Sequence, residues 1–185
     1  MAAKITRALL LATCLVGLAA PARPQWGAPA PEAGPDVAAF ASRLGVWDIT
    51  MHRRQDDGSD QPLDHGFELR VEYLEDGRTV LTRFVVAPPN AFFGASLRAW
   101  DEEAGLWRLM YVNATAGRFV EGEIRFQGEA QITTIRGGYA GEPGLVFRST
   151  ETLVAPGRTE TRFHESRDEE RTWQETGYYF TAVRR

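Results

Sequence analysis

Hydrophobic and polar residues alternate with a period of two from Gly45 almost to the C-terminus. The clearest case is the segment 67–73, in which large apolar side chains occupy every second position and charged side chains lie between them. This alternation predicts a β-strand with one face toward a core and one toward water. The same pattern predicts further strands over 46–53, 78–86, 96–101, 106–113, 118–126, 130–136, 144–153, 158–167 and 172–183.

The connections between these segments are short clusters of turn-forming residues, such as 75–77 and 155–157. About ten strands without intervening helices indicate an antiparallel meander. Because an open sheet of that length leaves two unpaired edges, we expect an all-β fold, an antiparallel up-and-down β-barrel of about ten strands. A two-sheet sandwich is the alternative. Segment 106–112 is apolar on both faces, so we expect its outer face to be covered by the preceding helix or by a second copy in a homodimer.

A short helix is predicted before the first strand. Asp36 is a suitable N-cap, the next apolar residues recur at helical spacing through Leu44, and Gly45 ends the pattern. We expect this helix to plug or flank the barrel. Segment 23–35 is rich in Pro and Ala and predicts a linker. Residues 36–185 then form the β-barrel domain.

The first 22 residues resemble a secretory signal peptide. Lys4 and Arg7 precede an apolar stretch over 8–20, and small residues around Ala22 offer a cleavage site. The apolar stretch is shorter than the roughly 20 residues of a membrane-spanning helix, so stable membrane insertion is not expected. These features predict a secreted or periplasmic protein. Lipidation at Cys14 is an alternative.

Composition excludes several chemistries. The 185 residues suffice for one domain with a core, and the formal net charge of −4 without a basic cluster argues against nucleic-acid binding. The only lysine, Lys4, and the only cysteine, Cys14, lie in the predicted signal peptide. The mature chain would therefore have no disulfide, thiolate nucleophile or Schiff-base lysine.

Eight side chains are candidates for lining a binding cavity, because their positions share the inward face of a predicted strand. They are Phe67, Leu69, Arg98, Trp100, Trp107, Tyr111, Glu175 and Tyr179. If Arg98 and Glu175 both point inward, they could pair with each other or with a ligand carboxylate. The aromatic candidates could instead fill the core. A bulge at Gly177 would turn Tyr178 and Phe180 inward and Tyr179 outward.

No metal or cofactor site is predicted from the three histidines. His52 and His164 fall on the outward faces of their strands, and His65 lies at a strand end. No two of them have the spacing of metal ligands.

Three segments together carry a family resemblance: FASRLGVWDIT at 40–50, SLRAWDEEAGLWRLMYV at 96–112 and SRDEERTW at 166–173. The chain resembles a family of uncharacterised, largely bacterial lipocalin-like barrels of the calycin and nitrobindin type. The resemblance implies a cup-shaped binding fold without defined catalytic residues, in which Trp47 closes the barrel floor. Some related barrels carry haem through a single histidine.

The segment 166–173 also approximates a hairpin pattern, S-x-D-x-G-x-T-W, in which Ser and Asp bind the amides of the turn. Glu170 occupies the glycine position. Because only glycine adopts left-handed backbone without cost, the substitution predicts a longer turn or a turn of another type.

These features favour an exported protein that binds a small apolar or amphipathic molecule. Two alternatives remain. One is an enzyme that uses the same cup, an isomerase or a haem-dependent activity employing a carboxylate, a tyrosine or His65. The other is a structural module of the cell envelope.

Overall fold

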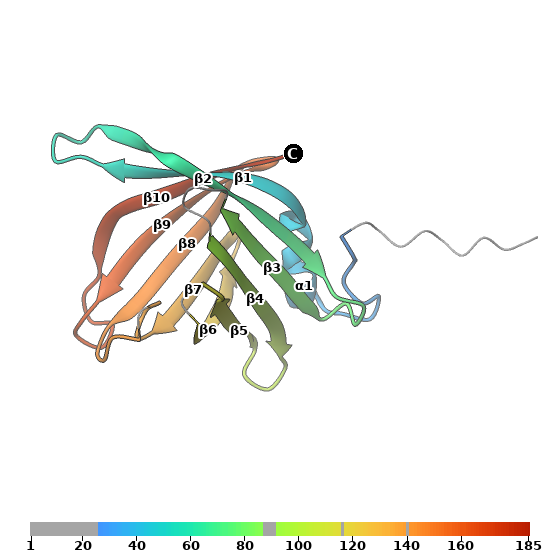
Figure 1. Cartoon of the computed structure of the whole chain (residues 1–185). Coiled ribbons are helices and arrows are strands. Elements are labelled where there is room, and N and C mark those ends of the chain that lie inside the picture. Colours follow the sequence, from blue (N-terminus) through green and yellow to red (C-terminus); the bar gives the residue numbers. More distant parts are fainter. Residues whose placement is uncertain (1–25, 87–91, 116, 140) are drawn as a thin grey trace, which may run out of the picture.

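A computed structural model describes residues 26–86, 92–115, 117–139 and 141–185. Within these ranges the chain forms ten antiparallel strands, each hydrogen-bonded to the next, and β1 pairs with β10 to close a barrel (Figure 1). The strands are β1 Gly45–Arg54, β2 Asp60–Tyr73, β3 Thr79–Val86, β4 Phe92–Asp101, β5 Leu106–Asn113, β6 Arg118–Gln127, β7 Ala130–Arg136, β8 Val146–Ala155, β9 Arg158–Ser166 and β10 Gln174–Arg184. The predicted up-and-down barrel is confirmed, and the sandwich alternative is wrong. The predicted signal peptide lies outside the described residues.

The first hairpin is longer than the sequence pattern predicts. β2 begins at Asp60 rather than near residue 67, and its first half pairs with the end of β1. The turn is held by Asp57, whose carboxylate accepts hydrogen bonds from the Ser59 amide at 2.8 Å and the Ser59 hydroxyl at 2.6 Å. This end of the hairpin projects past the rest of the barrel (Figure 1). Its apolar alternation is weak there because no core lies beneath it.

The predicted helix is present in a different form. It consists of a short α-helix, α1 Pro35–Ala38, which continues as a 3-10 helix over Ala39–Arg43. The helix begins one residue earlier than predicted, with Gly34 rather than Asp36 as the N-cap. Proline is suited to the first helical position because it has a fixed φ and no amide proton to leave unsatisfied.

This helical segment plugs one end of the barrel. Phe40 is completely buried, with its ring 4.7 Å from that of Trp107 and 5.1 Å from that of Phe126. Strand side chains also donate hydrogen bonds to helix carbonyls: the indole of Trp107 to Asp36 at 3.2 Å and that of Trp47 to Arg43 at 2.8 Å. These contacts fix the plug because they satisfy the buried indole N–H groups with carbonyls of the helical segment.

The described part of the predicted linker, residues 26–34, is docked on the barrel. The Tyr73 amide donates to the Trp26 carbonyl at 2.9 Å, and the Ala30 amide donates to the Gly77 carbonyl at 3.0 Å. A Cβ at Gly77 would lie 2.4 Å from the Ala30 nitrogen, so glycine is required for this close approach. The Pro- and Ala-rich composition of the segment predicts a free tether. The segment is docked nevertheless, because backbone hydrogen bonds hold it and these do not depend on the identity of its side chains.

An apolar surface remains on the outside of the barrel. Leu97 and Met110 face each other across β4 and β5, with 46% and 49% of their surfaces exposed. The helix packs at the barrel end instead of over this face, so the prediction that the helix covers β5 is wrong. The homodimer stays a prediction.

The hairpin between β9 and β10 keeps the expected hydrogen bonds with an unexpected backbone. Asp168 accepts from the Thr172 amide at 2.9 Å and the Thr172 hydroxyl at 2.6 Å, and the Ser166 hydroxyl donates to it at 2.8 Å. Glu170 has φ 69° and Glu169 has φ 58°, both left-handed. Glu170 therefore keeps the left-handed conformation that the pattern assigns to glycine, because the hydrogen-bond network holds a non-glycine residue in the strained conformation. The expectation that the residue at this position would leave that conformation is wrong.

These bonds predict the pH response of Asp168. Hydrogen bonds from the Thr172 side chain and amide, and from Ser166, lower the pKa of Asp168 to about 2. The unfolded value is about 3.9. Because the folded pKa is the lower one, the contribution to stability is complete above about pH 4 and is lost as the pH falls toward 2. A carboxyl-detected NMR titration should show this midpoint, and Thr172→Val should move it upward. A titration midpoint of Asp168 near pH 4 in the unaltered protein would contradict the hydrogen-bond network around its carboxylate.

Candidate functional site

The barrel interior contains a cavity of about 100 Å³ above the helical plug. At its open end a wider mouth of about 460 Å³ lies between strand ends remote from the plug. The mouth leads into the cavity, because six aromatic side chains line both spaces. They are Phe67, Phe84, Tyr111, Tyr139, Phe163 and Phe180. The cavity alone could hold only a small polar group or a few water molecules. Together with the mouth it reaches the size of a small-molecule site.

These six side chains and Phe147 form a closed aromatic collar around the entrance. Each ring contacts the next, with centroids 4.6–6.2 Å apart, and Phe180 returns to Phe67 at 5.3 Å. Six rings come from strands, but Tyr139 comes from the loop between β7 and β8. The collar gives the mouth an apolar surface that a flat or aliphatic group can contact.

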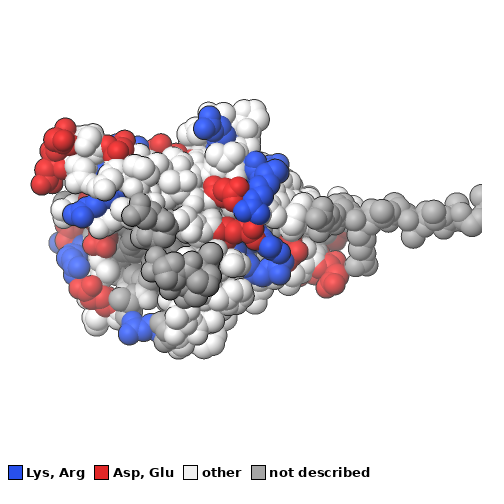
Figure 2. All heavy atoms as spheres, turned by 45° about the horizontal axis from the view of Figure 1, so that its top comes forward, with Lys and Arg blue, Asp and Glu red and all other residues white. Residues whose placement is uncertain are grey.

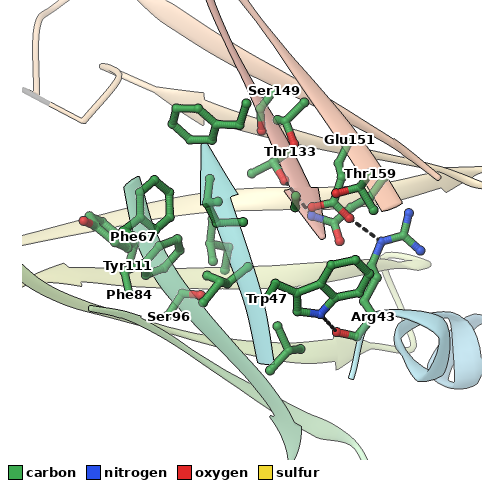
Figure 3. Close-up of a pocket in the computed structure, with 18 of the residues that line it drawn as sticks. Arg43, Trp47, Phe67, Phe84, Ser96, Tyr111, Thr133, Ser149, Glu151 and Thr159 are labelled. Carbon is green, nitrogen blue, oxygen red and sulfur yellow. Dashed lines mark hydrogen bonds and ion pairs between the residues drawn. The ribbon is translucent and has the colours of Figure 1, made fainter. Parts of the chain in front are cut away.

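Below the collar, one wall of the cavity is polar. Figure 3 shows Thr133, Ser149 and Thr159 on this side around Glu151, while Phe67, Phe84 and Tyr111 lie on the opposite side. The carboxylate of Glu151 accepts a hydrogen bond from the Arg43 guanidinium at 2.7 Å. Their side chains are 21% and 7% exposed, so this ion pair is largely shielded from water. It joins the plug to β8 at the bottom of the cavity.

Arg98, on β4, is the second guanidinium that lines the cavity. It lies over the ring of Phe40 at 5.1 Å from the centroid. Burial lowers the pKa of Arg98 to about 10, with Glu151 acting in the opposite direction, so it remains a cation at neutral pH. Among the described lining residues, two guanidiniums therefore accompany one carboxylate, and that carboxylate is bound to Arg43.

Several buried polar atoms near Arg98 lack a hydrogen-bond partner among the described residues. They are the hydroxyls of Thr82 and Ser96, which face each other across β3 and β4, the Nε of Arg98 and the side-chain oxygen of Gln131. Buried polar groups without partners are uncommon in folded proteins because each one costs free energy. Three of these residues, Ser96, Arg98 and Gln131, line the cavity, which indicates a place where polar atoms of a ligand or solvent complete the hydrogen bonds.

Four of the eight predicted side chains line the cavity. Phe67 and Leu69 come from β2, Arg98 from β4 and Tyr111 from β5. Their strands follow the regular two-residue alternation, which made the inward face readable from sequence.

Trp100 and Trp107 belong instead to the barrel floor. Trp107 is completely buried against Phe40, and the two indole rings are 6.0 Å apart. Both line a shallow depression beside the plug rather than the central cavity. They point inward as predicted, but the plug occupies the space in front of them, so the prediction that they line the cavity is wrong.

Glu175 and Tyr179 lie outside the barrel, so the prediction that they line the cavity is also wrong. Glu175 pairs with Arg162 at 3.1 Å, and Tyr179 stacks on His52 with ring centroids 4.6 Å apart. The inward positions of β10 are instead Thr176, Tyr178 and Phe180. The register between β10 and β9 shifts around Gly177, where φ is +76°, but the shift leaves Glu175 and Tyr179 on the same outer face. The alternative inward face is confirmed: Phe180 reaches the cavity and Tyr178 reaches the mouth.

The histidines with described side chains do not line the cavity or the mouth. His52 contacts Tyr179 and donates to or accepts from the Thr181 hydroxyl at 2.9 Å on the outer surface. His164 also lies outside both spaces. The side chain of His65 is outside the described part of the structure. Within the described residues, no cluster of three His, Cys, Asp or Glu side chains could hold a metal ion.

Sequence reasoning missed the ion pair of the cavity and the loop residue that completes its aromatic collar. Glu151 shares the strand parity of Phe147, so the alternation of β8 could have placed it inward. Arg43 follows Phe40 at helical spacing, but its partner is 108 residues away. Tyr139 lies in a loop, for which periodicity gives no signal.

Charges on the outer surface are mixed. Figure 2 shows basic and acidic side chains interspersed over the face it presents. Arg185, for example, binds both Asp48 and Glu68 near the C-terminus. In the part of the chain that is described, no helix combines the length and apolar character needed to cross a bilayer.

Comparisons with known proteins support the fold. No protein-family model and no curated protein matches the sequence. Among solved structures, Rv2717c from M. tuberculosis aligns over 83% of this chain and 99% of its own, with 9% sequence identity and a TM-score of 0.50. EF1p2_mFAP2b bound to DFHBI aligns over 80% and 98% of the two chains, with 11% identity and a TM-score of 0.38. A DUF3598-family protein of unknown function from Nostoc punctiforme aligns over 83% and 100%, with 10% identity and a TM-score of 0.28. The similarity to Rv2717c concerns the barrel fold alone.

Proposed function

We propose that this protein binds a small apolar or amphipathic molecule inside its barrel. The observation that carries the proposal is the closed aromatic collar, which surrounds the passage from the mouth to a partly open interior. A barrel that served only as a structural module would gain stability from filling this space, because unfilled interior volume forfeits packing contacts. The plug at the other end closes the cup, so ligand would enter through the mouth.

The proposed location is the periplasm or the outside of the cell. It rests on the signal-peptide pattern of residues 1–22. An exported protein that encloses an apolar molecule would keep it in solution in an aqueous compartment.

Binding can be tested with the neutral dye Nile red, whose fluorescence rises in an apolar environment. We expect saturable binding to the unaltered protein and at least tenfold weaker binding to Ser149→Phe, which places a large side chain in the cavity from β8. Thr152→Phe is the matched control, because Thr152 lies on the same strand but is exposed on the outer face. Equal binding by all three proteins would place the dye outside the barrel and contradict the proposal.

A further inference from the structure

The charges inside the barrel define the ligand more narrowly, on the basis of the proposed binding function. We propose that Arg98 binds the carboxylate of an amphipathic ligand whose apolar part lies within the aromatic collar. Three observations carry this inference: a cation without an ion-pair partner, unpartnered polar atoms beside it, and a change from polar to apolar surface along the cavity.

The first observation is the charge balance of the cavity. Among its described lining residues, Arg43 and Glu151 are paired at 2.7 Å, whereas no carboxylate lies within ion-pair distance of Arg98. A buried cation without a counterion is costly, since the barrel interior solvates charge poorly. A ligand anion would supply the missing charge.

The second observation is the set of hydrogen-bonding groups around that cation. The Nε of Arg98 is buried without a partner, and the hydroxyl of Ser96 is unpartnered two residues before it on β4. A carboxylate accepts hydrogen bonds from guanidinium and hydroxyl groups simultaneously, and bonds to charged partners are the strongest of this kind. The same groups offer little to a purely apolar molecule.

The third observation is the change from polar to apolar surface along the cavity, which Tyr139 spans because it lines both the cavity that contains Arg98 and the apolar mouth. Tyr139 therefore connects the apolar ring to the charged region below. With the carboxylate of the ligand at Arg98, the attached apolar chain would pass between the rings of the collar.

Strand register gives the length of the apolar part. Arg98 is opposite Val80 on β3, and the collar residue Phe84 is four positions closer to the mouth, which is about 13 Å along an extended strand. A straight-chain carboxylate of medium length fits this separation. Decanoate is therefore a suitable probe, and decan-1-ol is its uncharged counterpart.

Isothermal titration calorimetry with these two probes tests the inference at neutral pH. We expect the unaltered protein to bind decanoate at least tenfold more tightly than decan-1-ol, the scale of one charge-assisted hydrogen bond. Arg98→Met should remove this preference while retaining decan-1-ol binding. Arg98→Lys should retain part of the preference, because it keeps the charge but not the planar fork.

Arg108→Met is the matched control. Arg108 lies on the neighbouring strand, one register position from Arg98, but its side chain is 55% exposed on the outer surface. This variant should keep the full preference for decanoate. Tyr139→Phe provides a second test outside the strands and should weaken decanoate binding severalfold without changing decan-1-ol binding.

The outcomes separate this inference from the proposed function. Equal binding of the two probes to the unaltered protein, or a preference that survives in Arg98→Met, would overturn the role of Arg98 and leave the binding function intact. Binding of Nile red but not of decanoate to the unaltered protein would also overturn the role of Arg98 and leave the binding function intact. If Nile red, decanoate and decan-1-ol all fail to bind, the proposed function itself fails. A parallel loss of both probes together with a lowered unfolding temperature in Arg98→Met would assign Arg98 a structural role only.

Discussion

Replacing Trp107 with alanine is expected to lower the free energy of unfolding by about 3–5 kcal/mol, the range for large aromatic side chains removed from a core. Trp107 is completely buried and contacts both Phe40 of the plug and Trp100 of the floor. Its indole also donates to the Asp36 carbonyl at 3.2 Å, so the variant would leave that carbonyl without this donor. The effect is large because this side chain both packs against the plug and donates a hydrogen bond to it.

Urea unfolding followed by far-ultraviolet circular dichroism measures this loss without relying on tryptophan fluorescence. The control is Phe119→Ala, which removes an aromatic side chain that is 75% exposed on β6. The control should change the free energy of unfolding by less than about 0.5 kcal/mol. If Trp107→Ala unfolds at the same urea concentration as the control, the plug does not pack on this indole.

Replacing Glu151 with glutamine is expected to cost about 3 kcal/mol of stability. The substitution keeps the shape of the side chain but removes the carboxylate bound to Arg43 at 2.7 Å. The cavity would then contain two guanidiniums and no carboxylate among its described lining residues. Breaking a buried ion pair is costly because the remaining charge has lost its counterion and is still shielded from water.

The surface pair of Glu142 and Arg167 provides the comparison. Its side chains are 46% and 62% exposed, so Glu142→Gln should cost less than about 1 kcal/mol. The double variant Arg43→Met, Glu151→Gln should recover part of the stability lost in Glu151→Gln alone, because it also removes the positive charge of Arg43 that would otherwise lack a counterion. If the double variant is no more stable than Glu151→Gln alone, the loss comes from packing rather than from charge.

Local sequence was sufficient to identify most of the strands. Their apolar alternation reflects a barrel with one dry face, and the short turns between them favour pairing between strands that follow one another in the chain. The same alternation placed Phe67, Leu69, Arg98 and Tyr111 toward the interior. It failed at Glu175 and Tyr179, because it assigns the inward face from Trp173, which precedes the first residue of β10. Thr176, Tyr178 and Phe180 are the residues that face inward.

The position of the plug could not be read from the helix alone. Apolar residues at helical spacing show that one face is buried, but not which part of the barrel covers it. Phe40 fills the floor in front of Trp107, so the two floor tryptophans became core residues instead of cavity residues. The outer surface at Leu97 and Met110 consequently stays exposed.

By itself, the sequence determined an all-β chain of about ten antiparallel strands with a short leading helix, because secondary structure follows from the period of local side-chain burial. Tertiary structure decided which side chains share the enclosed space. Barrel closure assembled the aromatic collar from six strands and a loop, and it brought Arg43 to Glu151 across 108 residues. It also left Arg98 without a carboxylate partner within ion-pair distance among the described residues. Charge pairing inside a barrel depends on the shear of the closed sheet and on the depth at which the plug sits in it. Both are set by the assembled fold and cannot be read from any single segment.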